Sequence, residues 1–171
     1  LSPVPGPETF SHLQWDMDMI DAPEAHASSK GDGVLVGIID TGIDGDHPDL
    51  AANFDPFLSR NFTTDIPDID GPCEYDGCVD PADVDHGGHG THVAGTVAAD
   101  DDGVGIMGVA PDATLVNLRA GQDSGYFFFA ETVAALVYAA GNGIDVVNMS
   151  FYTDPWLYNC ASEDDYISGV W

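Results

Sequence analysis

One uninterrupted run of apolar residues limits the folds that this chain can adopt. Residues 34–39 read Val-Leu-Val-Gly-Ile-Ile, and they lie between the turn residues Gly31-Asp32-Gly33 and the carboxylate of Asp40. A strand without polar alternation is covered on both faces, as in a parallel sheet between two helix layers. Similar runs alternate with amphipathic segments along the chain, with strands expected at 113–118 and 144–149 and helices at 93–98 and 131–140. This alternation predicts an α/β fold of three layers, α/β/α, with a mainly parallel central sheet.

Functional side chains are expected where the buried strands end. Asp40 directly follows the first run, and a buried carboxylate must be paired or hydrogen-bonded. Taken alone, Asp40 would be interpreted as a residue that caps a turn. His89 precedes a segment in which small apolar residues recur at helical spacing, so it is placed at or just before the first turn of a buried helix. A histidine there is held by rigid backbone and faces a cleft.

Three segments carry a family resemblance. His-Gly-Thr-His-Val-Ala-Gly at 89–95 resembles the histidine motif of the subtilase family of serine proteases. The segment 36–44, followed by His-Pro-Asp-Leu at 47–50, resembles its aspartate motif, and 146–150 resembles its substrate-strand segment. The resemblance implies a subtilisin-like fold and a serine-type endopeptidase that acts on proteins or peptides. It makes Asp40 the orienting carboxylate and His89 the catalytic base.

The same resemblance implies two substrate-binding segments. The segment that begins at Ser150 would pair with the substrate backbone and form a wall of the side-chain pocket. Many members have glycines where Phe151 and Tyr152 stand, so the shape of that pocket is expected to differ. Gly125 and Tyr126 begin the region of the opposing substrate strand, and the aromatic residues there fit subsite walls and core packing equally well.

An acidic, glycine-containing stretch follows the histidine helix at the place where the family has a calcium loop. Ca²⁺ prefers several oxygen ligands, mixing carboxylates with backbone carbonyls. Carried over by position, the resemblance implies a structural Ca²⁺ in this loop. Its ligands would be the side chains of Asp49 and Asp102 and the carbonyls of Asp100, Val104 and Ile106, and Gln14 is a candidate for one further ligand. Without an ion, the same stretch would be a solvated acidic turn.

The sequence predicts an extended N-terminal arm at 1–14 and the amino-terminal portion of a subtilisin-like peptidase domain at 15–171. Within that domain, 53–85 is expected to be a long acidic surface loop. The family's nucleophile motif, Gly-Thr-Ser, does not occur in these 171 residues. We therefore expect the fold to be incomplete at its C-terminus, with the nucleophile serine and the oxyanion asparagine beyond residue 171. A piece ending there would be inactive alone.

The charge balance excludes some partners. Thirty acidic residues face three basic ones, for a net charge of −27, so nucleic acids and anionic membranes are not expected partners. No apolar run reaches the roughly 18–20 residues of a membrane span. Such acidity fits a secreted, calcium-binding protein or adaptation to high salt, which screens the repulsion. We expect a secreted monomer.

The three cysteines leave two interpretations open. Cys73 and Cys78 flank a short turn, and they are either a local disulfide in an oxidising compartment or two free thiols. Cys160 has no obvious partner among the three cysteines, and it would pair with a group beyond residue 171.

Two other functions fit parts of the sequence. His86, His89 and His92, with Asp83 and Asp85, could ligate zinc, although their spacing does not make them convergent on a helix. A non-catalytic pseudoprotease could keep the fold as a binding module. A nucleotide-binding domain is disfavoured because no Gly-x-Gly-x-x-Gly loop follows the first strand.

Overall fold

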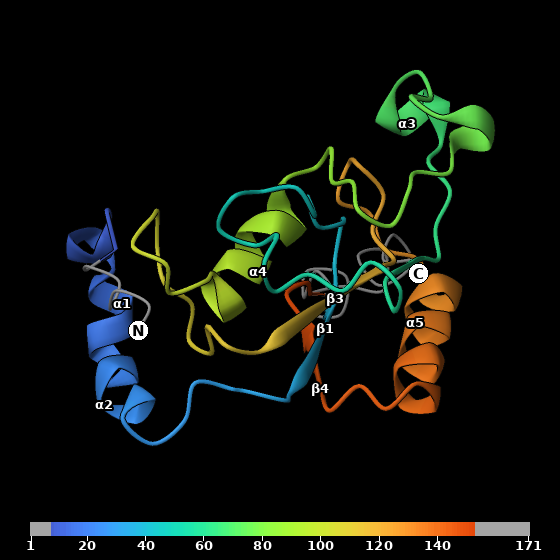
Figure 1. Ribbon diagram of the computed structural model, residues 1–171. Helices are drawn as coiled ribbons and strands as arrows, with labels where there is room; N and C mark the ends of the chain where they lie inside the picture. Colours follow the sequence, from blue (N-terminus) through green and yellow to red (C-terminus); the bar gives the residue numbers. More distant parts are fainter. Residues whose placement is uncertain (1–7, 153–171) are drawn as a thin grey trace, which may run out of the picture.

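The computed structural model describes residues 8–152, and within them a four-stranded parallel sheet lies between helices (Figure 1). The sheet has the order β2-β3-β1-β4, and each neighbouring pair is parallel. Its strands are β1 (Leu35–Ile39), β2 (Arg60–Asn61), β3 (Thr114–Arg119) and β4 (Val146–Met149). Val36 of the central strand lies opposite Leu115 of β3 on one side and Val146 of β4 on the other. The predicted strands therefore form one parallel sheet.

Two helices supply the outer layers, and they lie on opposite faces of the sheet (Figure 1). They are α4 (His89–Ala98) and α5 (Phe129–Gly141). Alternate residues of the strands face each helix: Ile38 packs in the core with Ala94 and Ala98 of α4, whereas Ile39 packs with Ala135 and Ala139 of α5. This two-sided core explains the apolar run without polar alternation, and it confirms the three-layer α/β/α prediction.

Shorter helices complete the described part of the chain. They precede β1 or lie between β2 and α4: η1 (Ser11–Leu13), α1 (Trp15–Met19), α2 (Ala22–His26), α3 (Pro67–Asp70) and η2 (Asp76–Cys78). None of the helices in residues 8–152 is long and apolar enough to cross a bilayer.

The prediction of an extended arm through residue 14 is wrong for residues 8–14. These residues turn and form η1. Their backbone is fastened to the acidic loop after α4, because the Phe10 amide donates to the Gly105 carbonyl at 2.8 Å and Gln14 is hydrogen-bonded to Met107. Hydrogen bonds to a distant loop, which local sequence does not reveal, fold this segment onto the domain. The rest of the predicted arm, residues 1–7, lies outside the described residues.

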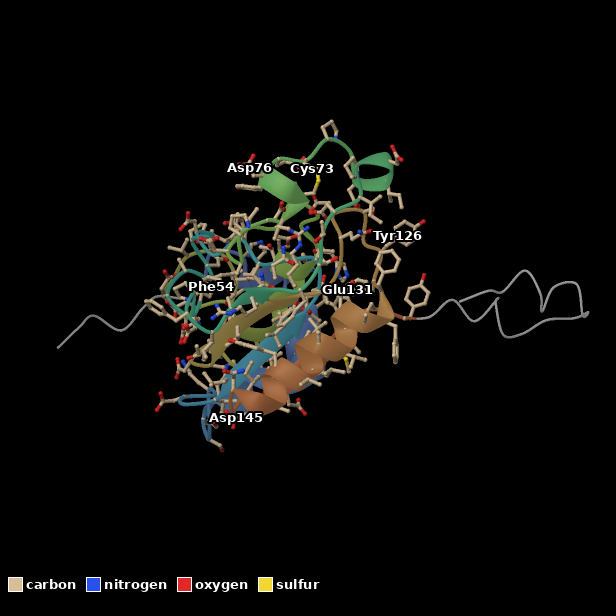
Figure 2. The ribbon with its side chains drawn as sticks, turned by 90° about the vertical axis from the view of Figure 1, so that its right-hand side faces the viewer. Phe54, Cys73, Asp76, Tyr126, Glu131 and Asp145 are labelled. Carbon is tan, nitrogen blue, oxygen red and sulfur yellow. A yellow bond between two sulfur atoms is a disulfide. The ribbon has the colours of Figure 1, made fainter. Side chains whose placement is uncertain are left out.

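The segment 53–85 is more ordered than the predicted surface loop. It contains β2, α3 and η2, and the Sγ atoms of Cys73 and Cys78 are bonded to each other (Figure 2). Asp65 and Asp80 are only 5% and 3% exposed, respectively. These two carboxylates point inward because they pair with Arg119, whose side chain is fully buried.

Candidate active site

The ends of three strands meet at one edge of the sheet, and the predicted functional residues gather there. Asp40 follows β1, the segment 120–127 follows β3, and Ser150 follows β4. Figure 2 shows Tyr126 toward one end of the molecule and Asp145, in the turn before β4, toward the other. Carboxyl ends of parallel strands are the usual place for a functional site in an open α/β sheet.

Asp40 and His89 are in direct contact. Nδ1 of His89 lies 2.7 Å from Oδ1 of Asp40, which also accepts a hydrogen bond of 2.8 Å from the Thr41 amide. The carboxylate is fully buried, whereas the imidazole side chain is 56% exposed. Because Nδ1 faces the carboxylate, Nε2 is the ring nitrogen left to interact with a molecule in the cleft. A buried acid thus fixes the ring of an accessible base.

A polar network fixes the start of α4, and hence His89, relative to β1. Oδ1 of Asp85 accepts hydrogen bonds from the Thr41 hydroxyl and the Gly88 amide, both at 2.9 Å. Oδ2 of Asp85 accepts from the amide and the hydroxyl of Thr91. The Thr41 hydroxyl oxygen in turn accepts from the Gly90 amide at 3.0 Å. Asp85 therefore satisfies amide groups that a helix start leaves without partners.

The sequence places Asp85 beside the histidines of the zinc alternative, and its role at the start of α4 was not predicted. The available signal was an acidic residue a few positions before a helix start, where a carboxylate can accept hydrogen bonds from the free amides of the first turn.

The close approach of α4 to β1 depends on the absence of a side chain at Gly90. A Cβ atom built there would lie 2.9 Å from Cβ of Asp40 and would overlap the Gly42 carbonyl oxygen. The glycine after His89 in the motif is thus explained by the close approach of its backbone to Asp40 and Gly42.

A cleft of about 500 Å³ lies beside His89. All five predicted substrate-binding residues line it, together with Thr41, Gly87, Asp123, Ser124 and Phe127; the five are Gly125, Tyr126, Ser150, Phe151 and Tyr152. The structure therefore brings together residues that are far apart in the sequence.

The aromatic residues of this cleft divide into packed and open ones. Phe127 stacks on Phe151 with ring centroids 4.2 Å apart, and both pack against the core under α5. Tyr126 and Tyr152 are 62% and 85% exposed. Phe127 and Phe151 are thus fixed against the core, whereas Tyr126 and Tyr152 are free to contact a bound molecule.

The acidic loop after α4 brings carboxylates together with an unpredicted partner, Glu8. Glu8 is buried; its Oε1 accepts a hydrogen bond of 2.8 Å from the Gly103 amide, and Oε2 has no hydrogen-bond partner among the described residues. Burial, together with the charges of Asp102, Asp101 and Asp49, raises the pKa of Glu8. Carboxylates of like charge thus gather around the buried side chain of Glu8 at this loop.

Gln14, the predicted additional ligand, is engaged elsewhere. Its amide nitrogen donates to the Met107 carbonyl at 2.8 Å, and its oxygen accepts from the Met107 amide at 3.0 Å. Sequence reasoning missed Glu8 because nothing in the local sequence shows that residue 8 folds back onto residue 103.

The three histidines of the zinc alternative do not converge. His89 pairs with Asp40, and Nε2 of His86 lies 3.8 Å from Oδ2 of Asp80. Within residues 8–152 two groups of side chains are close enough to share an ion: Glu74, Asp80 and His86, and Asp65, Asp80 and Asp123. The carboxylates of the second group are already paired with the Arg119 guanidinium. Neither group contains His89 or His92, so the part of the chain that the structure describes does not form the alternative zinc cluster.

Comparison with known proteins agrees with this geometry. The model of the subtilase family, peptidase S8, matches residues 31–167. The chain belongs to the subtilase family. It is 38% identical over 142 residues to the major intracellular serine protease of Bacillus subtilis (strain 168), covering 82% of this chain and 41% of that protein. It is 37% identical over 134 residues to an intracellular serine protease of Paenibacillus polymyxa, covering 78% of this chain and 37% of that protein.

A third subtilase relative is subtilisin DY of Bacillus licheniformis, which is 36% identical over 139 residues, covering 81% of this chain and 44% of that protein. The chain thus spans less than half the length of each of these relatives.

Proposed function

We propose that the protein containing this chain is a serine-type endopeptidase in which Asp40 and His89 are two members of an Asp-His-Ser triad. The contact of 2.7 Å between His89 Nδ1 and Asp40 Oδ1 carries the proposal. Membership of the subtilase family supports it. The third member is proposed to be a serine beyond residue 171, because the family's Gly-Thr-Ser motif is absent from these residues.

The proposed mechanism assigns each group a proton or a charge. A serine hydroxyl is a weak nucleophile until a base removes its proton during attack. Nε2 of His89 would take that proton and later donate it to the leaving amine, while Asp40 holds the ring in the required tautomer and stabilises the imidazolium. Burial of Asp40 strengthens that stabilisation because the low local dielectric increases the attraction between the two charges.

The cleft walls are proposed to bind an extended peptide between two backbone segments. The segments 125–126 and 150–152 both line the cleft next to His89. Tyr126 and Tyr152, both exposed, would contact side chains of the substrate, whereas Phe151 is already stacked on Phe127 and would form a fixed wall. These contacts favour a protein or peptide substrate with apolar residues near the cleaved bond.

We further propose that the loop after α4 binds a structural Ca²⁺. Its ligands would be side-chain oxygens of Asp49 and Asp102 and the carbonyls of Asp100, Val104 and Ile106, with Glu8 in place of Gln14. The fit rests on Oε2 of Glu8, a buried oxygen without a partner among the described residues, in a group of like charges. A bound cation would offset that repulsion and fix the N-terminal segment on the loop.

Two features of the structure bear on where the domain begins and on the compartment in which it folds. Residues 8–14 are hydrogen-bonded to the loop after α4, so we propose that the peptidase domain begins before residue 15. The bond between Cys73 and Cys78 supports an oxidising compartment and hence secretion. The relatives' names do not decide this, since they include intracellular serine proteases and a subtilisin. We propose that the natural protein is a monomer, and its sedimentation checks this.

Labelling with a fluorophosphonate tests the catalytic proposal directly. The natural full-length protein should react covalently at one serine, and the labelled peptide should lie beyond residue 171. His89→Ala and Asp40→Asn should abolish or strongly slow the labelling, whereas His12→Ala, at an exposed histidine far from the cleft, should not. A correctly folded wild-type protein that stays unlabelled would overturn the endopeptidase and leave the pseudoprotease as the explanation.

A further inference from the structure

A buried arginine joins two segments that are far apart in the sequence. Arg119 ends β3 and is fully buried. Its NH2 group lies 2.9 Å from both carboxylate oxygens of Asp65 and 3.0 Å from Asp123, and its NH1 group lies 2.6 Å from Asp80. Its Nε–H donates to the Gly121 carbonyl at 3.3 Å. One guanidinium thus faces three carboxylates from two segments.

The two segments are also joined by direct hydrogen bonds. We call residues 122–126 the rim segment, because it lines the cleft from Asp123 onward, and residues 63–80 the disulfide loop. The Asp123 amide donates to Oδ1 of Asp65 at 3.1 Å, and the Ser124 amide donates to Oδ1 of Asp70 at 3.0 Å. The Gln122 side chain donates to the Thr64 carbonyl at 2.8 Å. The backbone of the rim segment is therefore held by side chains of the disulfide loop.

The disulfide loop is itself anchored at the same point. The Asp65 amide donates to the carbonyl of Cys78 at 2.9 Å, and Cys78 is bonded to Cys73. Figure 2 shows Cys73 and Tyr126 toward the same end of the molecule. The disulfide is thus linked to Asp65 by a hydrogen bond, and Asp65 is linked to the cleft by its hydrogen bond with the Asp123 amide.

Charge explains why this arrangement fixes one geometry. Burial alone would lower the pKa of Arg119, but the hydrogen bond to Asp80 and the charges of Asp65, Asp80 and Asp123 outweigh it and raise the pKa. The guanidinium therefore stays charged, and a buried charge must keep its partners. A shift of Asp65 would remove one of the three carboxylates that face Arg119, and it would leave the Asp123 amide without its acceptor.

We propose that the disulfide loop, acting through Asp65 with Arg119 and through Asp70, positions the rim segment and so sets the affinity for extended peptide substrates. This inference rests on the proposed function, because the rim segment is the place where an extended peptide would lie. Asp65, Asp70 and Arg119 are positioning residues: they do not line the cleft, and they act on it through the backbone of Asp123 and Ser124.

The test compares Asp65→Asn with Asp68→Asn in the natural full-length protein. Asp68 is exposed on α3 in the same loop, and its side chain makes no hydrogen bond or ion pair within residues 8–152, so it is a matched control. Two substrates separate positioning from catalysis: an extended peptide that reaches the rim segment, and a small activated ester that reaches only the catalytic groups. Amide hydrogen exchange of residues 122–126 gives a readout that is independent of activity.

Asp65→Asn should raise KM for the extended peptide about tenfold, the effect of losing roughly one well-placed hydrogen bond to the substrate. It should leave kcat for the small ester unchanged and speed exchange of the Asp123 amide. Asp68→Asn should change none of these. Unchanged KM and unchanged exchange in Asp65→Asn would overturn the positioning role.

Failure of the proposed function has a different signature, since wild-type protein would then hydrolyse neither substrate while exchange in the rim segment would still respond to Asp65→Asn. If Asp65→Asn does not fold, Asp70→Asn at a half-buried position serves instead. Faster exchange of the Ser124 amide with a higher KM supports the proposal, and wild-type values for both overturn it.

Discussion

At the scale of single residues, the spacing between Asp40 and His89 depends on a position that has no side chain. Gly90→Ala would place a methyl group 2.9 Å from Cβ of Asp40 and against the Gly42 carbonyl. Overpacking of this kind costs about 1–3 kcal/mol. We expect a lower urea midpoint and slower fluorophosphonate labelling. Gly141→Ala, where a Cβ meets nothing within 4 Å, should lower neither quantity, and wild-type labelling by Gly90→Ala would contradict the close-approach argument.

The carboxyl of Asp123 gives a prediction whose sign follows from its pKa. Burial raises that pKa, and the charges of Asp65 and Asp80 add to the effect, whereas the attraction of Arg119 opposes it. A raised pKa contributes stability below the unfolded value, which is about 4, and this contribution is lost as the pH rises through the folded value.

At neutral pH Asp123→Asn should therefore unfold at the same urea concentration as wild type or at a higher one. This advantage should disappear below about pH 4, where the unfolded carboxyl is protonated as well. Urea unfolding over a pH series checks it. A variant that is markedly less stable than wild type at pH 7 would show that the ion pair with Arg119 outweighs burial.

At the scale of elements, the start of α4 depends on Asp85. Asp85→Ala removes the acceptor of four hydrogen bonds, from Thr41, Gly88 and the two donors of Thr91. Loss of an acceptor whose donors are partly buried costs roughly 1–3 kcal/mol, and it should also let His89 move away from Asp40. Chemical denaturation should show the lower stability, and the rate of serine labelling should fall. Asp83→Ala, at an exposed neighbour, is the control; equal effects of the two variants would exclude a specific role for Asp85.

Elements held by local patterns were predictable from sequence, and elements held by distant contacts were not. The apolar run of β1 and the helical spacing of α4 indicate their structure within a few residues, so the sheet and both helix layers were expected. The inward turn of Asp65 and Asp80 depends on Arg119, about 40 to 55 residues away in the chain, a pairing that a single sequence does not display.

The candidate site divides in the same way. Asp40 and His89 stand out because each lies in a short motif, and the structure places them 2.7 Å apart. Glu8 was not predicted because its hydrogen-bond partner, Gly103, is 95 positions away in the chain. Gln14 was the predicted ligand, but its side-chain amide is hydrogen-bonded to Met107.

At the scale of the whole molecule, the net charge of −27 on these 171 residues should make stability depend on salt. Repulsion among exposed carboxylates destabilises a compact state, and salt shortens the range of that repulsion from about 10 Å at 0.1 M to about 3 Å at 1 M. The Tm should rise as the NaCl concentration is raised at a fixed Ca²⁺ concentration. A Tm that is constant or falls between 0.1 and 1 M NaCl would show that this repulsion does not limit stability.

Calcium should stabilise the whole molecule through one loop and the segment that folds onto it. An ion that binds only the folded state adds about 2.7 kcal/mol at a concentration of 100 Kd. In the His89→Ala background, which is designed to prevent self-cleavage, Ca²⁺ should raise the Tm and a chelator should reverse the change. Glu8→Gln and Asp49→Asn should reduce the shift, because each removes a charge from the proposed ligand set.

Glu24→Gln, at an exposed glutamate on α2, changes the net charge equally and should keep the full shift. This control separates binding at the loop from general screening of an acidic surface. An equal response of all variants to Ca²⁺ would place the stabilising ion elsewhere. If the shift of Tm with Ca²⁺ is lost in Asp49→Asn but kept in Glu8→Gln, the ion binds at the loop and Glu8 is not one of its ligands.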